Sequence, residues 1–372
     1  MEPVRWIWQS TTWPHLTFDA GRLARPLALA RQESGALYGT AAAIGLDEQA
    51  MLEREVWSKE AVATAAIEGE IIDLATVRSS VAHRLGLTLQ APAVPRAVEG
   101  LLDVMENAAD VWELPLTRER LCAWQAALFP TASTIRDIVV GEYRSGPDPM
   151  QIVSGPHGRE RVHYQAVAGA AVRAEMHAFL NWFNGTAEVD GLLRAGLAHV
   201  WFESVHPFED GNGRVGRAVV DLALAQDARR SSRLLGISAA MRRRQDDYYD
   251  ALNNAQRGNG DVTSWLQWFL DTYTEACRTS TALIGEALAR ARFWADHHAA
   301  PLNEMQRRVL NKMLEAGPGR FDGGLTARKY TVIAGTTKVT ASRHIADLLE
   351  KGLIVRAPGP SGRSTRYDIA LA

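Results

Sequence analysis

Apolar side chains recur along most of the chain at intervals of three and four residues, the spacing that places them on one face of an α-helix. An irregular, tryptophan-bearing segment leads into the first helix within residues 1–45. The pattern then predicts helices over residues 47–77, two more within 95–129, and others over 168–184, 190–205, 214–228 and from about 261 into the 290s. A mainly α fold is therefore expected.

The helical pattern breaks between residues 141 and 164. Two short β-prone pieces, 150–154 and 161–164, flank a Gly-Pro-His-Gly turn. Extended segments on either side of such a turn predict a β-hairpin.

The last part of the chain, residues 301–372, differs in charge and in pattern. It contains 12 Lys and Arg against 6 Asp and Glu, a balance of +6, whereas the first 300 residues carry 29 against 37, a balance of −8. Its predicted elements are helices over 303–315, 325–333 and 338–351, followed by strands over 353–356 and 365–369. This is the element order of a winged helix-turn-helix.

Composition narrows the class of protein. The chain has 372 residues, of which 47% are hydrophobic and 23% charged, as is ordinary for globular proteins with more than one core. Its two cysteines, Cys122 and Cys277, are too far apart to suggest a disulfide framework or a thiolate metal site. No signal peptide or membrane-spanning stretch is evident. We therefore expect a cytoplasmic protein without membrane contacts.

The segment HPFEDGNGRVGR occupies residues 206–217, between two predicted helices. Pro207 and the glycines place residues 206–213 in a loop. Gly211 and Gly213 allow the backbone to turn successive N–H groups inward, and the helix that follows adds free amides and the positive end of its dipole. Such a loop is suited to hold phosphate groups.

The side chains of this segment add the chemistry of group transfer. Arg214 and Arg217 lie three residues apart on the first helical turn and can donate to further phosphate oxygens. Asp210 offers a carboxylate to Mg²⁺. His206 can accept the proton of an attacking hydroxyl near neutral pH, as a general base does. Together these residues indicate phosphoryl or nucleotidyl transfer.

The segment resembles the signature His-Pro-Phe-x-Asp/Glu-Gly-Asn-Gly/Lys-Arg-x-x-Arg of Fic proteins, and the resemblance extends over about residues 55–275. It implies a Fic-type helical core with a β-hairpin flap, and transfer of AMP from ATP to a Ser, Thr or Tyr hydroxyl of a protein. By the family's pattern His206 is the base, Asp210 binds Mg²⁺, and Asn212 and the loop amides hold the α-phosphate. The two arginines would bind the outer phosphates.

The resemblance also implies a substrate-binding surface around this segment. The hairpin at 148–164 is similar to the family's flap, which adds the target as an edge strand while Ile152 or Val153 clamps a side chain; a plain structural hairpin is the alternative. Tyr249, in a Tyr-Tyr pair, and Gln256 resemble residues that line an adenine site. The tyrosines could equally belong to core and surface.

Upstream, Thr64-Ala65-Ala66-Ile67-Glu68-Gly69 resembles the inhibitory motif Ser/Thr-x-x-x-Glu-Gly/Asn of autoinhibited Fic proteins. Thr64 and Glu68 are four residues apart and share a helix face. The hypothesis is that Glu68 pairs with Arg217, so that ATP binds with its α-phosphorus misaligned. An incidental surface glutamate is the alternative, and in some relatives this glutamate also helps to remove AMP.

These interpretations divide the chain into an N-terminal helical region with the inhibitory helix at 1–95, a catalytic core at 96–295 and a winged helix-turn-helix at 301–372. The last module could bind DNA or a protein, and homodimers are frequent among relatives. DNA contacts would come from Lys338, Thr340, Ser342, Arg343, Arg363 and Arg366. A competing reading is an ATP-sensing, DNA-binding regulator with little transferase activity. Other donors, such as UTP or CDP-choline, are a further alternative.

Overall fold

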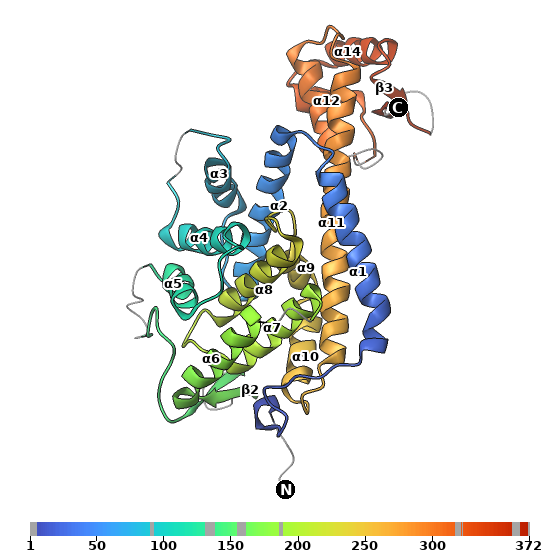
Figure 1. Ribbon diagram of the computed structural model, residues 1–372. Coiled ribbons are helices and arrows are strands. Elements are labelled where there is room, and N and C mark those ends of the chain that lie inside the picture. The colour runs from blue at the N-terminus through green and yellow to red at the C-terminus, as the bar shows by residue number, and fades with distance from the viewer. Residues whose placement is uncertain are drawn as a thin grey trace. The chain divides into compact units, whose positions relative to one another are not determined.

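The computed structural model forms two compact units, residues 1–281 and 282–372, which are described separately (Figure 1). It describes residues 6–89, 93–130, 138–154, 161–185, 189–316, 321, 323–358 and 365–370. The boundary predicted at residue 95 lies inside the first unit. The fold is mainly helical, as the sequence predicts. Among the helices so described, none combines the length and apolar character needed to cross a lipid bilayer.

The first unit contains the predicted helices, some with different bounds, and further helices between residues 237 and 256 that were not predicted. After a short 3-10 turn at Ile7–Gln9, its helices are α1 (Ala20–Ala41), α2 (Leu46–Ile67), α3 (Leu74–Arg84), α4 (Arg96–Asp110), α5 (Arg118–Leu128), α6 (Gly169–Gly185), α7 (Gly191–Val205), α8 (Asn212–Ala228), α9 (Ile237–Arg243), α10 (Gln245–Gln256) and the first half of α11 (Thr263–Asp296).

Helices α7 and α8 form the centre of this unit and pack against each other, with α2, α4, α6 and α10 around them (Figure 1). Nearly every residue of α7 and of the first four turns of α8 is buried, as expected of helices that are covered on all sides. The α8 helix begins at Asn212, inside the predicted loop of residues 206–213. Gly211 has a positive φ of 83° and acts as the helix cap, so the loop is shorter than predicted.

The pattern expected as helical over 47–77 is divided by a turn. Helix α2 ends at Ile67, Glu68 forms its C-cap, and Gly69 has a φ of 79°. Glycine adopts this left-handed conformation without the steric cost that other residues carry. The turn places Glu68 and Glu70 between α2 and α3.

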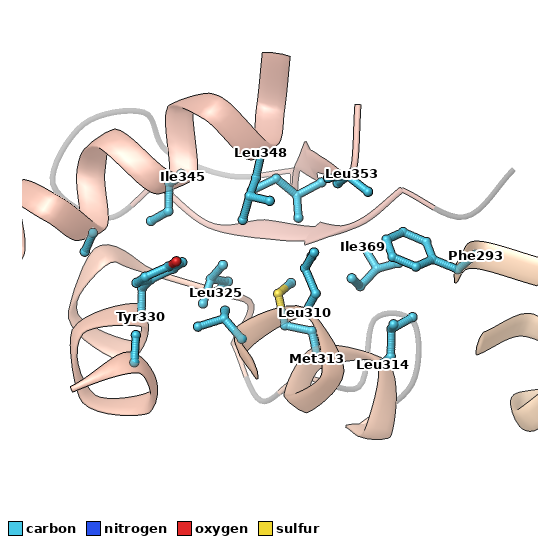
Figure 2. Packing of buried hydrophobic residues seen from close by; sticks show 14 residues of the cluster. Phe293, Leu310, Met313, Leu314, Leu325, Tyr330, Ile345, Leu348, Leu353 and Ile369 are labelled. Atoms are coloured by element: carbon cyan, nitrogen blue, oxygen red, sulfur yellow. The ribbon is translucent and has the colours of Figure 1, made fainter. Parts of the chain in front are cut away.

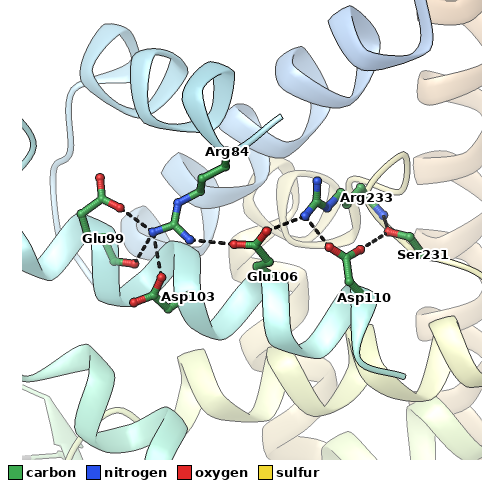
Figure 3. Close-up of polar contacts among 7 residues, drawn as sticks. All are labelled: Arg84, Glu99, Asp103, Glu106, Asp110, Ser231 and Arg233. Atoms are coloured by element: carbon green, nitrogen blue, oxygen red, sulfur yellow. Dashed lines mark hydrogen bonds and ion pairs between the residues drawn. The ribbon is translucent and has the colours of Figure 1, made fainter. Parts of the chain in front are cut away.

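A row of ion pairs fixes α3 against α4 (Figure 3). Arg84 of α3 is paired with Glu99, Asp103 and Glu106 of α4. Glu106 is shared with Arg233, which follows α8 and also binds Asp110. Because these pairs form a network around two largely buried guanidinium groups, they hold the end of α3 and the segment after α8 against α4 more firmly than single surface pairs would.

The predicted hairpin is present as the antiparallel strands β1 (Pro149–Ser154) and β2 (Arg161–Ala168), with Ile152 opposite Tyr164. Strand β2 extends four residues beyond the predicted piece, to Ala168. Ala166 and Val167 in this extension are buried. Their packing against the rest of the unit extends the strand beyond the length that the local sequence pattern predicts.

The second unit contains α12 (Glu304–Ala316), α13 (Ala327–Ala334) and α14 (Lys338–Glu350), followed by the antiparallel strands β3 (Ile354–Arg356) and β4 (Tyr367–Ile369). Its core is drawn from all of these elements, including Leu310, Tyr330 and Leu348 (Figure 2). The element order is the predicted one, while the assignment as a winged helix-turn-helix stays a prediction. Arg363 lies outside the described residues.

Candidate active site

Residues 206–211 form a tight loop between α7 and α8. His206 directly follows α7 with a left-handed φ of 51°. The Asn212 side chain closes the loop: its Oδ1 accepts from the Phe208 N–H and its Nδ2 donates to the Phe208 carbonyl, both at 2.8 Å. Phe208 itself is fully buried. The side chain of Asn212 thus shapes the loop, and the amides of the first turn of α8 are the groups left for an anion.

Arg144 holds the same loop from the side of the hairpin, a role that sequence reasoning missed. Its Nε donates to the His206 carbonyl at 2.7 Å, and its Nη2 donates to the Val205 carbonyl at 2.9 Å and to the Val167 carbonyl at 2.7 Å. The side chain is buried. One guanidinium therefore ties strand β2 to the end of α7 and fixes the backbone at His206.

Arg217 is buried on α8 and is bound by Glu68, its predicted partner, and also by Thr64 of the same motif. Its Nη2 lies 2.9 Å from Glu68 Oε1, its Nε donates to Thr64 Oγ1 at 2.7 Å, and Nη2 also donates to the Thr64 carbonyl at 2.9 Å. A Cβ added at Gly213 would overlap the Glu68 carboxylate. The carboxylate thus lies against the first turn of α8, where an anion is favoured.

Arg214 has a second acidic partner that sequence reasoning did not identify. Its Nη1 lies 2.8 Å from Glu70 Oε1, and its guanidinium stands 5.3 Å from the centre of the Phe129 ring. Glu70 follows Glu68 by two residues, and on a continuous helix the two side chains would point in different directions. The positive φ of Gly69 turns the chain so that both carboxylates face α8.

Glu203, one helical turn before His206, is a further residue that the sequence analysis missed. It is 6% exposed, and its Oε2 lies 3.6 Å from His206 Nδ1. Burial by itself raises the pKa of this carboxyl, but the interaction with His206 and the charges of His199 and Arg217 outweigh burial and lower the pKa. The spacing Glu-x-x-His on a helix was a signal that could have revealed the pair.

A cavity of about 760 Å³ opens beside this loop. Its volume lies within the range of small-molecule sites, about 300–1,000 Å³. Six of the predicted site residues line it: Glu68, Ile152, His206, Gly213, Tyr249 and Gln256. Glu203, Tyr164 and Tyr248 line it as well. The cavity therefore joins the predicted base, the predicted inhibitory residue and the predicted nucleotide-binding residues.

The tyrosine pair divides between two environments. Tyr248 is buried, and its hydroxyl lies 2.9 Å from His199 Nε2. Tyr249 is 40% exposed, and its hydroxyl donates to the Ile67 carbonyl at the end of α2 at 2.9 Å. Gln256 is almost fully buried. One wall of the cavity thus presents two aromatic rings and an amide, groups suited to a purine.

Asp210 is exposed in the loop just ahead of α8, and its Oδ1 accepts from the Gly211 N–H at 2.6 Å. Among the residues that the structure describes, no group of three His, Cys, Asp or Glu side chains could hold a metal. A single carboxylate beside a phosphate site nevertheless fits Mg²⁺, which is commonly held by one or two carboxylates and the phosphates of a substrate. The side chain of Val153 lies outside the described residues.

A known family matches the part of the chain that contains this loop. The model of the Fic/DOC family matches residues 115–224, which include the whole 206–217 segment. The chain contains a Fic/DOC domain. A second model, described as a domain of unknown function (DUF4172), matches residues 6–87 and includes the α2–α3 turn.

Solved structures agree with this assignment of the Fic fold. A Fic family protein from Desulfovibrio desulfuricans has a TM-score of 0.53 at 22% identity over 94% of this chain and 95% of its own. A Fic domain containing signaling protein from Bacteroides thetaiotaomicron has a TM-score of 0.53 at 17% identity, over 70% and 96%. Fic-1 from C. elegans has a TM-score of 0.50 at 18% identity, over 72% and 73%.

A curated relative is similar over a shorter stretch. A probable protein adenylyltransferase from Aquifex aeolicus is 33% identical over 79 residues, 21% of this chain. The match spans 22% of that relative's length.

Proposed function

We propose that this Fic-domain protein transfers AMP from ATP to a hydroxyl of a protein. The observation that carries the proposal is the position of His206: it lies in the wall of a nucleotide-sized cavity, at the loop that precedes the N-terminus of α8. The name of the Aquifex relative, a probable protein adenylyltransferase, agrees with this reaction. In this proposal the target is a Ser, Thr or Tyr side chain, of another protein or of this one.

In the proposed reaction His206 accepts the proton of the target hydroxyl as its oxygen attacks the α-phosphorus. The bond from phosphorus to the pyrophosphate oxygen breaks, and the first-turn amides of α8 stabilise the charge that develops on the phosphate oxygens. Arg214 and Arg217 bind the outer phosphates once they are free of their carboxylates. Asp210 would hold Mg²⁺, which would supply further neutralisation of phosphate charge.

The walls of the cavity suit the two substrates of this reaction. Tyr249 and Gln256 supply an aromatic ring and an amide for the adenine base. Ile152 lines the cavity from strand β1, which lies at the edge of the two-stranded sheet. An extended target segment can therefore add to β1 by main-chain hydrogen bonds and bring its hydroxyl towards His206.

We further propose that the protein is autoinhibited by the turn between α2 and α3. Glu68 is bonded to Arg217, and Glu70 to Arg214, so both arginines of the motif are engaged by carboxylates of one short segment. The Glu68 carboxylate also lies against Gly213, on the first turn of α8. With the arginines engaged, ATP binds without the contacts that align its α-phosphorus, and transfer is slow. Removal of AMP with help from Glu68 is a second activity that the same geometry allows.

The proposed donor can be tested with a panel of nucleotides offered to the Glu68→Gly variant. Intact-mass spectrometry should detect addition of one AMP from ATP, with UTP and CDP-choline inert because Tyr249 and Gln256 form a purine-sized site. Addition of UMP, phosphocholine or phosphate would refute ATP-dependent AMP transfer. Tight ATP binding with no transfer of any group would instead favour the nucleotide-sensing regulator.

A second candidate function concerns the C-terminal unit. The first three turns of α14 expose Lys338, Val339, Ser342, Arg343 and Ala346 on one face, and the exposed Glu350 follows only at the end of the helix. Val339 is 81% exposed. Two cations, a hydroxyl and an apolar contact on one helix face suit the phosphates and base edges of duplex DNA, and this observation favours DNA over a protein partner for residues 301–372.

A further inference from the structure

A buried carboxylate lies behind the imidazole of His206. Glu203 is held between α7 and α8: its Oε2 faces His206 Nδ1 at 3.6 Å, and its Oε1 lies so close to Gly216 that a Cβ at that position would overlap it. The helix pair thus leaves space for this carboxylate only because position 216 lacks a side chain. Oε1 has no hydrogen-bond partner among the described residues.

An ionised carboxylate is costly to bury unless neighbouring charges and donors compensate it. The only side chain for which the structure records direct pairing with Glu203 among the described residues is His206. Further charged or titratable groups interact with the Glu203 carboxylate from the elements around it, namely His199 on α7, Arg217 on α8, Tyr248 and Tyr249 on α10 and Tyr164 on β2. Glu68, after α2, acts on the neighbouring His199 and Arg217. Arg217 and His199 favour the ionised form of Glu203, and the imidazole of His206 is its direct ion-pair partner.

We propose that Glu203 is a positioning residue that accepts a hydrogen bond from the Nδ1–H of His206 and thereby leaves Nε2 as the proton acceptor. The inference rests on the proposed transferase function. When the target O–H bond breaks and the O–P bond forms, the proton passes to Nε2 and the imidazole becomes a cation. The charge of Glu203 stabilises that cation and orients the ring, while Glu203 itself stays ionised.

The backbone of His206 is held in place as well as its side chain. His206 adopts a left-handed φ of 51°, which is uncommon for residues other than glycine, although histidine adopts it more readily than most. Arg144 fixes this conformation through the His206 carbonyl at 2.7 Å. Backbone and side chain of His206 are therefore both fixed, by Arg144 and by Glu203, as a general base aimed into the cavity requires.

The variant Glu203→Gln, made in the Glu68→Gly background, tests the proposal by kinetics. We expect kcat for AMP transfer to fall by about 10- to 100-fold, the usual effect of losing a residue that orients a functional histidine. The KM for ATP should stay within about twofold, since Glu203 does not contact the phosphates in this scheme. The acid limb of the pH–rate profile should move to lower pH, because a neutral amide no longer favours the imidazolium.

The matched control is Glu209→Gln, in the same loop. The Glu209 carboxylate accepts a hydrogen bond from the Val139 N–H at 2.8 Å and has no recorded contact with His206 among the described residues. This variant should leave the pH–rate profile unchanged. Glu203→Gln with an unaltered kcat and pH–rate profile would overturn the proposal, as would a loss expressed only in the KM for ATP.

A second measurement needs no variant of Glu203 and no transfer reaction. In protein labelled with ¹⁵N-histidine, the neutral ring of His206, assigned by its absence in His206→Ala, should carry its proton on Nδ1. A ring protonated on Nε2 would refute the role of Glu203 even if the enzyme is active. The Nδ1–H tautomer together with an absence of AMP transfer would instead show that the proposed reaction, and not the pairing, is wrong.

Discussion

Two carboxylates that stand two residues apart in the sequence bind the two arginines of the 206–217 segment. Glu68 is one-third exposed beside a fully buried Arg217, whereas Glu70 is about half exposed beside Arg214. Both guanidinium groups are buried, so the two pairs differ mainly in their carboxylates, and solvent screens the more exposed Glu70 more strongly than Glu68. We therefore expect Glu68 to dominate the inhibition and Glu70 to contribute less.

The variant Glu70→Gln measures that smaller contribution. Because solvent screens the half-exposed Glu70 carboxylate, its pair with Arg214 should be worth about 1 kcal/mol or less. Freeing Arg214 should therefore lower the KM for ATP by no more than about fivefold, in the wild-type and in the Glu68→Gly background. Steady-state kinetics with labelled ATP would measure it. Glu53→Gln, on α2 and bonded to Gln49, is the control and should change nothing. A higher KM in Glu70→Gln would contradict the proposed competition.

At this scale the sequence revealed the residues of the motif but not the partners that fix them. His206, Arg217 and Glu68 were predicted because their motifs are local and their spacing is specific. Arg144 and Glu70 could not be assigned, because one acts on backbone carbonyls far along the chain and the other depends on the turn at Gly69. Glu203 could have been found from its spacing of three residues before His206.

Among the elements, the contact between α2 and α8 carries both the inhibitory pair and a second polar cluster. Glu60 lies two helical turns before Glu68 on α2, and Asp221 lies one turn after Arg217 on α8; both are buried and line one small cavity. The Glu60 carboxylate accepts from the amides of Ser238 and Ala239. Burial, and then the charge of Glu60, raise the pKa of Asp221 well above its usual value.

This raised pKa predicts how stability depends on pH. The folded state keeps the proton of Asp221 at pH values where the unfolded chain, with a pKa of about 3.9, has released it. The stability of the fold therefore falls as the pH rises from about 4 towards the folded-state pKa. Asp221→Asn removes this loss. Relative to wild type, it should therefore change the free energy of unfolding more favourably at pH 8 than at pH 4.

Urea unfolding of wild type and Asp221→Asn at both pH values would measure the difference. Asp247→Asn, an exposed carboxylate whose side chain is 63% accessible, is the control and should show little dependence on pH. An equal effect of Asp221→Asn at both pH values would contradict the buried, protonated carboxyl.

Most elements of the fold could be predicted because helical periodicity is strong in this chain. The differences arose where a glycine with positive φ or tertiary packing decided the boundary. Gly211 begins α8 inside the expected loop, Gly69 divides the first long helix, and burial of Ala166 extends β2. None of these follows from the spacing of apolar residues alone.

At the scale of the whole molecule, the candidate site draws on segments far apart in the sequence. The inhibitory turn lies within the match of residues 6–87, the loop and α8 within the match of residues 115–224, and Tyr249 and Gln256 beyond both. The motif could therefore be located from the sequence, whereas the cavity could be recognised only from the folded structure, which brings these distant segments together.

The C-terminal unit is expected to bind duplex DNA in a way that depends on salt. In the full chain, the double variant Lys338→Ala/Arg343→Ala should weaken binding and reduce the slope of log K against log salt by up to about two. The control Arg308→Ala/Lys312→Ala removes the same charge from α12, where both side chains are paired with glutamates, and should weaken binding less. No binding of the wild-type chain at low salt would refute DNA as the partner.

The most direct test of the whole account is transfer of label from α-labelled ATP by three purified proteins: wild type, Glu68→Gly and Glu68→Gly/His206→Ala. A hydrogen-bonded charge pair contributes about 1.5–3 kcal/mol, so freeing Arg217 should raise the rate of transfer by about tenfold or more. The additional loss of His206 should abolish it while the fold and ATP binding persist. An unchanged rate in Glu68→Gly, or transfer that survives His206→Ala, would contradict a transferase held inactive by Glu68.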